Sequence, residues 1–175
     1  MNNIKNKIRN IPDYPKPGIN FKDVTTLMRE GDVFKIIIEE MVSKLKDKGI
    51  DKIVGIDARG LIFGAPVAYA INAGFVPVRK TGKLPAKKIA QEYELEYGVD
   101  SIEIHEDAIS KGERVVLIDD LIATGGTALA AIQLIEKLQG EIVCCHFVVD
   151  LPNLGGSRKL TGMSLPFYSL CEFID

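Results

Sequence analysis

Two kinds of hydrophobic pattern alternate along this chain. Continuous apolar runs rich in β-branched residues are typical of strands that are buried on both faces of a sheet. Longer stretches with an apolar residue every three or four positions are typical of helices that cover such a sheet. The runs predict strands over residues 52–56, 75–78, 115–118 and 142–151, and the periodic stretches predict helices over residues 32–48, 63–73 and 127–139. This alternation predicts an α/β fold with a mainly parallel sheet flanked by helices.

Weaker patterns complete the predicted elements. Residues 4–11 predict a short helix, residues 101–105 alternate between polar and apolar and predict a strand, and residues 166–170 predict a closing edge strand. Asp32 can cap the helix that Gly49 ends. Residues 81–101 have little periodicity and are interpreted as a mobile flap that closes over a bound substrate.

Composition and charge exclude several classes of protein. The chain has 175 residues, of which 46% are hydrophobic and 26% charged, and this suits a single globular domain. The formal net charge of -2 gives no broad basic surface, so we expect neither a nucleic-acid nor a membrane partner. No apolar stretch approaches membrane-spanning length and the N-terminus has no apolar signal segment, so we expect a cytoplasmic protein.

The cysteines point to the core rather than to a redox or metal site. Cys144 and Cys145 are adjacent within an apolar run, and Cys171 is the third. We expect reduced core thiols, and a reactive pair is the alternative. The two histidines, His105 and His146, form no ligand cluster with the cysteines, so no zinc site is expected.

Candidate chemistry follows the apolar run at residues 115–118. Asp119 and Asp120 come directly after it, where ligands bind in open α/β sheets, and residues 123–127 (Ala-Thr-Gly-Gly-Thr) turn into the next helix. Glycines let the backbone approach a ligand, and a helix start offers N–H groups to a phosphate. The acids would repel a bare phosphate, but they can accept hydrogen bonds from sugar hydroxyls or share a divalent metal. The stretch predicts a ribose 5-phosphate site, and a Gly-rich turn beside solvated acids is the alternative.

A second strand–loop–helix unit carries polar residues in the same place. Asp57, Ala58, Arg59 and Gly60 follow the strand predicted over residues 52–56. A guanidinium can bind two oxygens of a diphosphate, and a glycine beside it allows close approach. The alternative is an arginine that only bridges two elements.

Two further segments have both a structural and a functional interpretation. Arg79, Lys80, Lys83, Lys87 and Lys88 lie within ten positions of a loop, and such a run is usually a solvated face but can also neutralise an anionic ligand. Three prolines within residues 12–17 favour a stiff extended path. Composition alone favours a surface strap there, and the alternative is a lip over a ligand site.

The quoted motifs resemble those of a known family. Residues 115–128 resemble the phosphoribosyl-pyrophosphate (PRPP) motif of the type I phosphoribosyltransferases, in which an apolar run, two acids and two variable residues precede Ala-Thr-Gly-Gly-Thr. Further segments resemble the adenine phosphoribosyltransferases, in that family's order, at residues 11–23, 55–68, 79–85, 93–98, 101–105 and 153–160. Leu61 stands where that family usually has Phe, and Asn20 stands where many relatives have an apolar residue.

The resemblance implies a fold, an activity and a set of site residues. It implies one domain over residues 1–175, with a hood over about residues 1–32 and a flap over about residues 81–101, in a homodimer. It implies purine salvage, in which adenine and PRPP give AMP and pyrophosphate, with Mg²⁺ carried by PRPP near Asp119 and Asp120. Catalytic roles are expected for Glu103, as general acid or base at the purine, and for Arg59, at the departing pyrophosphate. The expected PRPP-binding residues are Ala58, Arg59, Gly60, Arg79, Lys80, Lys83, Asp119, Asp120, Ala123, Thr124, Gly125, Gly126 and Thr127. The expected adenine-binding residues are Asn20, Phe21, Lys22 and Leu121.

Two other functions stay open from the sequence. One is a phosphoribosyltransferase for another base, such as hypoxanthine or xanthine, although the segments at residues 93–98 and 101–105 favour adenine. The other is a non-enzymatic PRPP sensor that regulates transcription. Such a sensor should carry a basic helix or a helix-turn-helix extension, and the sequence shows neither.

Overall fold

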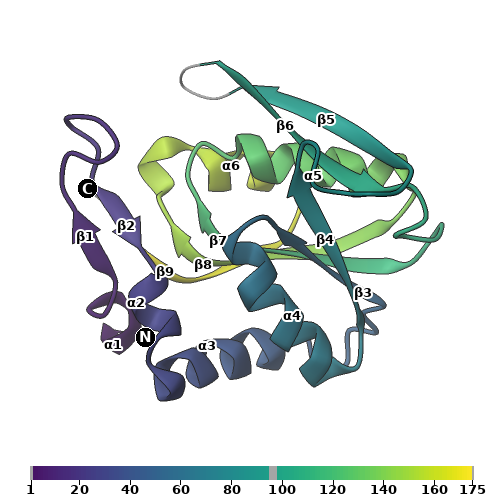
Figure 1. The fold of residues 1–175 in the computed structure, drawn as a ribbon. Helices are drawn as coiled ribbons and strands as arrows, with labels where there is room; N and C mark the ends of the chain where they lie inside the picture. The colour runs from purple at the N-terminus through teal and green to yellow at the C-terminus, as the bar shows by residue number, and fades with distance from the viewer. Residues whose placement is uncertain (1, 95–97, 175) are drawn as a thin grey trace.

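The computed structural model describes residues 2–94 and 98–174, and its centre is a twisted sheet of seven strands within these residues (Figure 1). The order across the sheet is β5-β6-β4-β3-β7-β8-β9. β4, β3, β7, β8 and β9 run parallel, whereas β6 is antiparallel to both β4 and β5. The strands are β3 (Lys52–Ile56), β4 (Gly74–Lys80), β5 (Lys88–Glu94), β6 (Val99–His105), β7 (Arg114–Ile122), β8 (Glu141–Asp150) and β9 (Phe167–Glu172). The predicted α/β fold with a mainly parallel sheet is confirmed.

Helices cover both faces of this sheet, as Figure 1 shows. α3 (Gly31–Ser43) and α4 (Arg59–Ile71) pack on one face, and α5 (Gly126–Lys137) and α6 (Gly156–Gly162) pack on the other. A 3₁₀ turn, η1 (Pro152–Leu154), precedes α6.

Consecutive residues of the central strands face opposite cores. Val116 packs with the residues of α3 and α4, whereas Leu117 packs with those of α5 and α6. Because successive side chains of a strand alternate between faces, a strand buried on both faces must be apolar throughout. This is the physical origin of the continuous apolar runs in the sequence.

The N-terminal segment forms a small unit that packs beside β9 and shares the core under α3 and α4. It contains α1 (Asn2–Lys5), an antiparallel hairpin of β1 (Arg9–Ile11) and β2 (Phe21–Asp23), and α2 (Thr25–Met28). The ammonium groups of Lys5 and Lys22 lie over the ring of Phe173, 4.7 and 4.5 Å from its centroid. The helix predicted over residues 4–11 is wrong beyond Lys5, because residues 9–11 pair with a strand ten to fourteen residues away in the chain. The role of this unit as a hood stays a prediction.

Several predicted boundaries need correction. α3 ends at Ser43 rather than at residue 48, and the residues after it form turns. α4 begins at Arg59 rather than at residue 63, and it ends at Ile71 with Asn72 in a left-handed conformation. β7 continues through both acids to Ile122, because its pairing with β8 continues as far as Asp150. Asp119 and Asp120 thus lie within the strand and not after it.

The predicted flap contains regular structure. β5 and β6 pair in register from Lys88 opposite His105 to Glu94 opposite Val99. The strand predicted over residues 101–105 is confirmed and begins two residues earlier. Residues 95–97 of the predicted flap lie outside the described residues.

The three cysteines lie in or against the hydrophobic core. Cys144 and Cys145 are buried, and all three thiols are free. Burial raises the pKa of Cys144, and it raises the pKa of Cys171 to about 11, so neither thiol is activated as a thiolate.

None of the helices in residues 2–94 and 98–174 has the length and apolar character that a membrane span requires.

Candidate active site

A cavity of about 370 Å³ opens at the carboxyl end of β7, between the start of α5 and the N-terminal hairpin. Residues from four separate segments of the chain line it, and most of them are predicted site residues. The predicted residues that line it are Asn20, Phe21, Lys22, Arg59, Asp119, Asp120, Leu121, Ala123, Thr124, Gly125, Gly126 and Thr127. Residues 20–22 of the proline-rich segment line this cavity, as the lip interpretation requires, and their contact with a ligand stays a prediction.

The turn at residues 123–127, called the phosphate loop below, is fixed by close backbone packing. Gly125 has φ +84°, and a Cβ on it would lie 2.9 Å from the Cα of Gly156. The Gly156 N–H donates to the Ala123 carbonyl at 2.9 Å, and the Lys159 ammonium donates to the Thr124 carbonyl at 2.9 Å. α5 begins directly after Gly125, and the first N–H groups of a helix have no carbonyl partner within it. The loop therefore directs backbone donors and the positive end of a helix dipole at the cavity.

Two acids and an arginine lie beside this loop. The Asp120 carboxylate accepts a hydrogen bond from Arg59 Nε, and an Asp119 oxygen accepts the Asp120 N–H at 2.8 Å. Burial, and then the charge of Asp120, raise the pKa of Asp119 well above its ordinary value. Burial alone would lower the pKa of Arg59, but the nearby carboxylates, Asp120 above all, together outweigh it and the pKa is raised. A charged site of mixed sign therefore borders the phosphate loop.

The start of α4 packs tightly against β7, and this brings Arg59 to the acids. A Cβ on Gly60 would lie 2.6 Å from the Ile118 carbonyl oxygen and 2.9 Å from an Asp119 carboxylate oxygen. Only glycine fits at this distance. Gly60 therefore has a packing role, and its contact with PRPP stays a prediction. Neither Gly60 nor Ala58 lines the cavity. The peptide between Asp57 and Ala58 is cis.

The acids suit a metal ion that is shared with a substrate. In the described residues no group of three or more His, Cys, Asp or Glu side chains is arranged to hold a metal. Mg²⁺ commonly binds through one or two carboxylates and completes its shell with water and substrate phosphates. The adjacent carboxylates of Asp119 and Asp120 fit this second type of site.

The structure does not bring the remaining predicted residues to the cavity. Arg79, Lys80, Lys83 and Glu103 are absent from its lining. Arg79 Nε donates to an Asp57 carboxylate oxygen at 2.8 Å. Burial would raise the pKa of Asp57, but Arg79, together with Lys80 and Lys83, outweighs it and the pKa is lowered. Glu103 accepts the Gly82 N–H at 3.0 Å, and Lys88 lies 3.6 Å from the same carboxylate. The catalytic role of Glu103 stays a prediction.

Sequence reasoning missed the apolar residues of the cavity. These residues are Ile19, Ile122, Ala128, Leu151 and Leu154. The rings of Phe21 and Tyr14 meet edge to face, with centroids 5.3 Å apart, so the proline-rich segment also supports Phe21. Ile19, Ile122, Ala128 and Leu154 lie in segments that resemble the family, which was the available signal for them. Leu151 lies outside these segments and carried no such signal, because an isolated leucine or isoleucine is normally core.

Comparisons with known proteins agree with this geometry. The family model described as "Phosphoribosyl transferase domain" matches residues 24–159. The adenine phosphoribosyltransferase of Nitrosomonas eutropha is 56% identical over 172 residues, which cover 98% of this chain and 99% of that protein.

Solved structures give the same result. The crystal structure of adenine phosphoribosyltransferase from Thermoanaerobacter pseudethanolicus matches with a TM-score of 0.93 and 48% identity, over 98% of this chain and 99% of that chain. The enzyme of Saccharomyces cerevisiae, complexed with an imino-altritol bisphosphate and adenine, matches with a TM-score of 0.91 and 38% identity, over 97% of each chain.

Proposed function

The chain belongs to the adenine phosphoribosyltransferases of the phosphoribosyl transferase domain family, and on that premise we propose that it converts adenine and PRPP to AMP and pyrophosphate. One observation carries the proposal. A single cavity joins a phosphate loop, two carboxylates, an arginine and the aromatic lip at residues 19–22. These groups match the 5-phosphate, the ribose hydroxyls, the diphosphate and the base of the two substrates. The Saccharomyces cerevisiae relative was crystallised with adenine, which supports the choice of base.

Different groups of residues would hold different parts of the PRPP molecule. The backbone donors of residues 123–127 would hold the 5-phosphate, and Asp119 and Asp120 would accept hydrogen bonds from the ribose hydroxyls. The bond between the anomeric carbon and the pyrophosphate oxygen breaks and its electron pair leaves with pyrophosphate. A nitrogen of adenine forms the new bond to that carbon, and the adenine ring gives up one proton. Positive charge grows on the ribose ring in this step, and the two carboxylates beneath it would stabilise that charge. Arg59 would stabilise the negative charge of the leaving group.

The base would be held by apolar contacts and backbone groups. Phe21 and Leu121 line the same cavity as the carboxylates, and they would pack against the adenine ring. The backbone around Asn20 and Lys22 would make the polar contacts to the base. Glu103 remains our candidate for proton exchange with a purine nitrogen, on the resemblance of residues 101–105 alone.

Three further properties are proposed, two from the family and one from the sequence. We propose that Mg²⁺ enters with PRPP and is shared by Asp119 and Asp120, where it would neutralise part of the pyrophosphate charge. We also propose a homodimer, which light scattering in solution would test. A cytoplasmic location is proposed from the sequence, and fractionation of cells would test it.

Steady-state kinetics with separate bases test the proposed function. The purified protein is supplied with PRPP and Mg²⁺ and with adenine, hypoxanthine, guanine or xanthine in turn. We expect release of pyrophosphate with adenine only. Turnover of another base would keep the PRPP site and contradict the adenine assignment. PRPP binding without any turnover would favour the sensor interpretation.

A further inference from the structure

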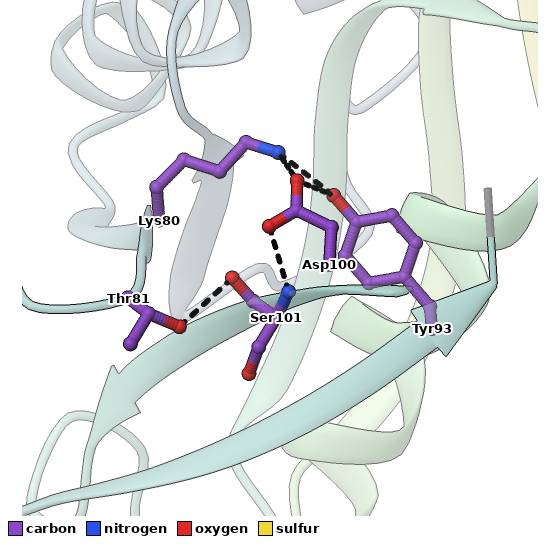
Figure 2. Close-up of polar contacts among 5 residues, drawn as sticks. All are labelled: Lys80, Thr81, Tyr93, Asp100 and Ser101. Atoms are coloured by element: carbon purple, nitrogen blue, oxygen red, sulfur yellow. Dashed lines mark hydrogen bonds and ion pairs between the residues drawn. The ribbon is translucent and has the colours of Figure 1, made fainter. Parts of the chain in front are cut away.

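A cluster outside the cavity holds one of the predicted PRPP-binding residues. Figure 2 shows the Lys80 ammonium, at the end of β4, pointing at the carboxylate of Asp100 and the hydroxyl of Tyr93. Lys80 donates to both groups, to the Tyr93 oxygen at 2.9 Å, and the Tyr93 hydroxyl donates to Asp100 at 3.1 Å. The other Asp100 oxygen accepts the Ser101 N–H at 2.8 Å. Each of the three side chains therefore contacts the other two.

The charges of the cluster are complementary. The hydrogen bond from Lys80, more than any other interaction, lowers the pKa of Asp100. Burial would lower the pKa of Lys80, but the hydrogen bonds with Asp100 and Tyr93 outweigh it and the pKa is raised. Lys80 and Asp100 are thus both ionised at neutral pH, and the ammonium is held in one place. A charge-assisted hydrogen bond limits the conformations of a long side chain more than a neutral contact does.

Tyr93 connects this cluster to the phosphate loop. Its side chain is buried, and a Cβ on Gly126 would lie 3.4 Å from Tyr93 Cδ2 and 3.0 Å from the Glu94 carbonyl oxygen. The end of β5 therefore lies directly against the residue with which α5 begins. The same tyrosine packs on the loop with its ring edge and bonds Lys80 and Asp100 with its hydroxyl.

We propose that Asp100 and Tyr93 are positioning residues for PRPP, which fix the Lys80 ammonium and hold the β5–β6 hairpin against the phosphate loop. The inference rests on the proposed function, because PRPP is the ligand that both parts would bind. Asp100 and Tyr93 act through Lys80 and Gly126 and do not touch the cavity themselves. Their loss should weaken PRPP binding and leave the adenine contacts of residues 19–22 intact.

Three variants and one matched control test the proposal. Asp100→Asn keeps the size of the side chain and removes its charge, and Tyr93→Phe keeps the ring against Gly126 and removes the hydroxyl. The control is Thr81→Val. The Thr81 hydroxyl donates to the Ser101 carbonyl at 3.1 Å and so joins the residue after β4 to the start of β6, and Figure 2 draws no bond from this hydroxyl to the Lys80 ammonium. The third variant combines Asp100→Asn with Tyr93→Phe.

The readouts are the Kd of PRPP with Mg²⁺ by calorimetry, the KM of each substrate, and the melting temperature. Loss of a charge-assisted hydrogen bond predicts a Kd for PRPP about tenfold higher in Asp100→Asn, and loss of a neutral one predicts about threefold in Tyr93→Phe. The double variant should weaken PRPP binding by much less than the sum of the two single effects, because the two side chains act on one ammonium. The KM of adenine should change by less than about twofold, and Thr81→Val should match the wild type.

The outcomes separate this inference from the proposed function. Equal Kd values for PRPP in the wild type, Asp100→Asn and Tyr93→Phe would overturn the inference while adenine turnover still stands. The inference would also be overturned if Thr81→Val weakened PRPP binding as much as Asp100→Asn does, because strand pairing alone would then explain the effect. A wild type that turns over no base would overturn the proposed function, and the Kd values would still decide the inference.

Discussion

The phosphate loop and the basic segment at residues 79–88 are both predicted anion sites, but only the phosphate loop lines the cavity. Every residue of the phosphate loop lines the cavity. Of the basic residues, Arg79, Lys80 and Lys88 each have a carboxylate partner, and none of the segment lines the cavity. The first site is made of backbone groups and the second of long side chains.

This difference shows which kind of site a sequence can locate. A backbone cradle is fixed by its own residues, because the glycines and the helix start determine where the N–H groups point. A lysine or arginine has a long side chain, and its position depends on charges from other strands. The positions of Arg79, Lys80 and Lys88 therefore depend on their carboxylate partners, which the local sequence does not identify.

The largest effect is expected where the backbone cradle is blocked. Gly125→Ala places a Cβ at φ +84° and 2.9 Å from the Cα of Gly156, so the loop must move. We expect kcat/KM for PRPP to fall by about 100-fold or more, as for the loss of preorganised donors elsewhere. Steady-state kinetics measure this fall.

A second glycine supplies the control for that variant. Gly112 has φ +80° with no atom within 4 Å of an added Cβ, so Gly112→Ala has the backbone strain without the clash. It should lose about 1–2 kcal/mol of stability and keep its kinetics. Gly125→Ala with wild-type kinetics would contradict the cradle.

Asp119→Asn separates function from stability. The pKa of Asp119 is higher in the folded protein than in the unfolded chain. Below the unfolded pKa the protonated acid therefore contributes its full stability to the fold. This contribution is lost as the pH rises through the folded pKa. At neutral pH, which lies above the unfolded pKa, this contribution is reduced or lost, and Asn removes the pH-dependent penalty. We expect a higher melting temperature at pH 7.5, no gain near pH 4, and kcat lower by about 100-fold because the ribose loses a negative charge.

Asp120→Asn is the matched control, because Asp120 is the partner of Arg59. Its substitution should lower the melting temperature at pH 7.5, since a partly buried guanidinium loses its counter-charge. A lower melting temperature for Asp119→Asn at this pH would show that Asp119 stabilises the fold when ionised, and would contradict its raised pKa.

Glu103→Gln tests the one predicted catalytic residue that lies with the basic segment. Gln can still accept the Gly82 N–H but cannot exchange a proton with a purine. If Glu103 reaches the base, kcat should fall by about 100-fold with an unchanged KM for PRPP. Full turnover by this variant would exclude the general acid–base role and leave Glu103 as a partner of Lys88.

The smallest effect is expected for single lysines of the basic segment. Lys83→Ala should raise the KM of PRPP by about fivefold, because a flexible surface charge contributes little on its own. Lys87→Ala changes an exposed lysine of the same segment and should leave this KM unaltered. Equal effects of the two variants would mean that the segment acts by its total charge and not through particular residues.

Local sequence was enough for the elements that carry their own pattern. The unit from the apolar run at residue 115 to the end of α5 was predicted because burial on both faces, the Gly-rich turn and the helical period are all properties of that stretch. The end of β7 was not, because its last residues depend on pairing with β8. The β1–β2 hairpin was missed for the same reason, since each strand has only three residues and its partner decides its conformation.

The same reasoning applies to the site. The phosphate loop, the two acids and Arg59 were predicted from residue types at strand ends. The contact of Lys80 with Asp100 and Tyr93 was not predicted, because it joins residues that are thirteen or twenty positions apart through the register of three strands. Apolar lining residues such as Leu154 carry no chemical signal of their own.

One competition experiment tests the central claim most directly. Limiting PRPP with Mg²⁺ is mixed with equal concentrations of adenine, hypoxanthine, guanine and xanthine, and the nucleotide products are separated and identified. We predict AMP with an equal amount of pyrophosphate, and none of the other three nucleotides. A product other than AMP, or consumption of no PRPP at all, would contradict the account.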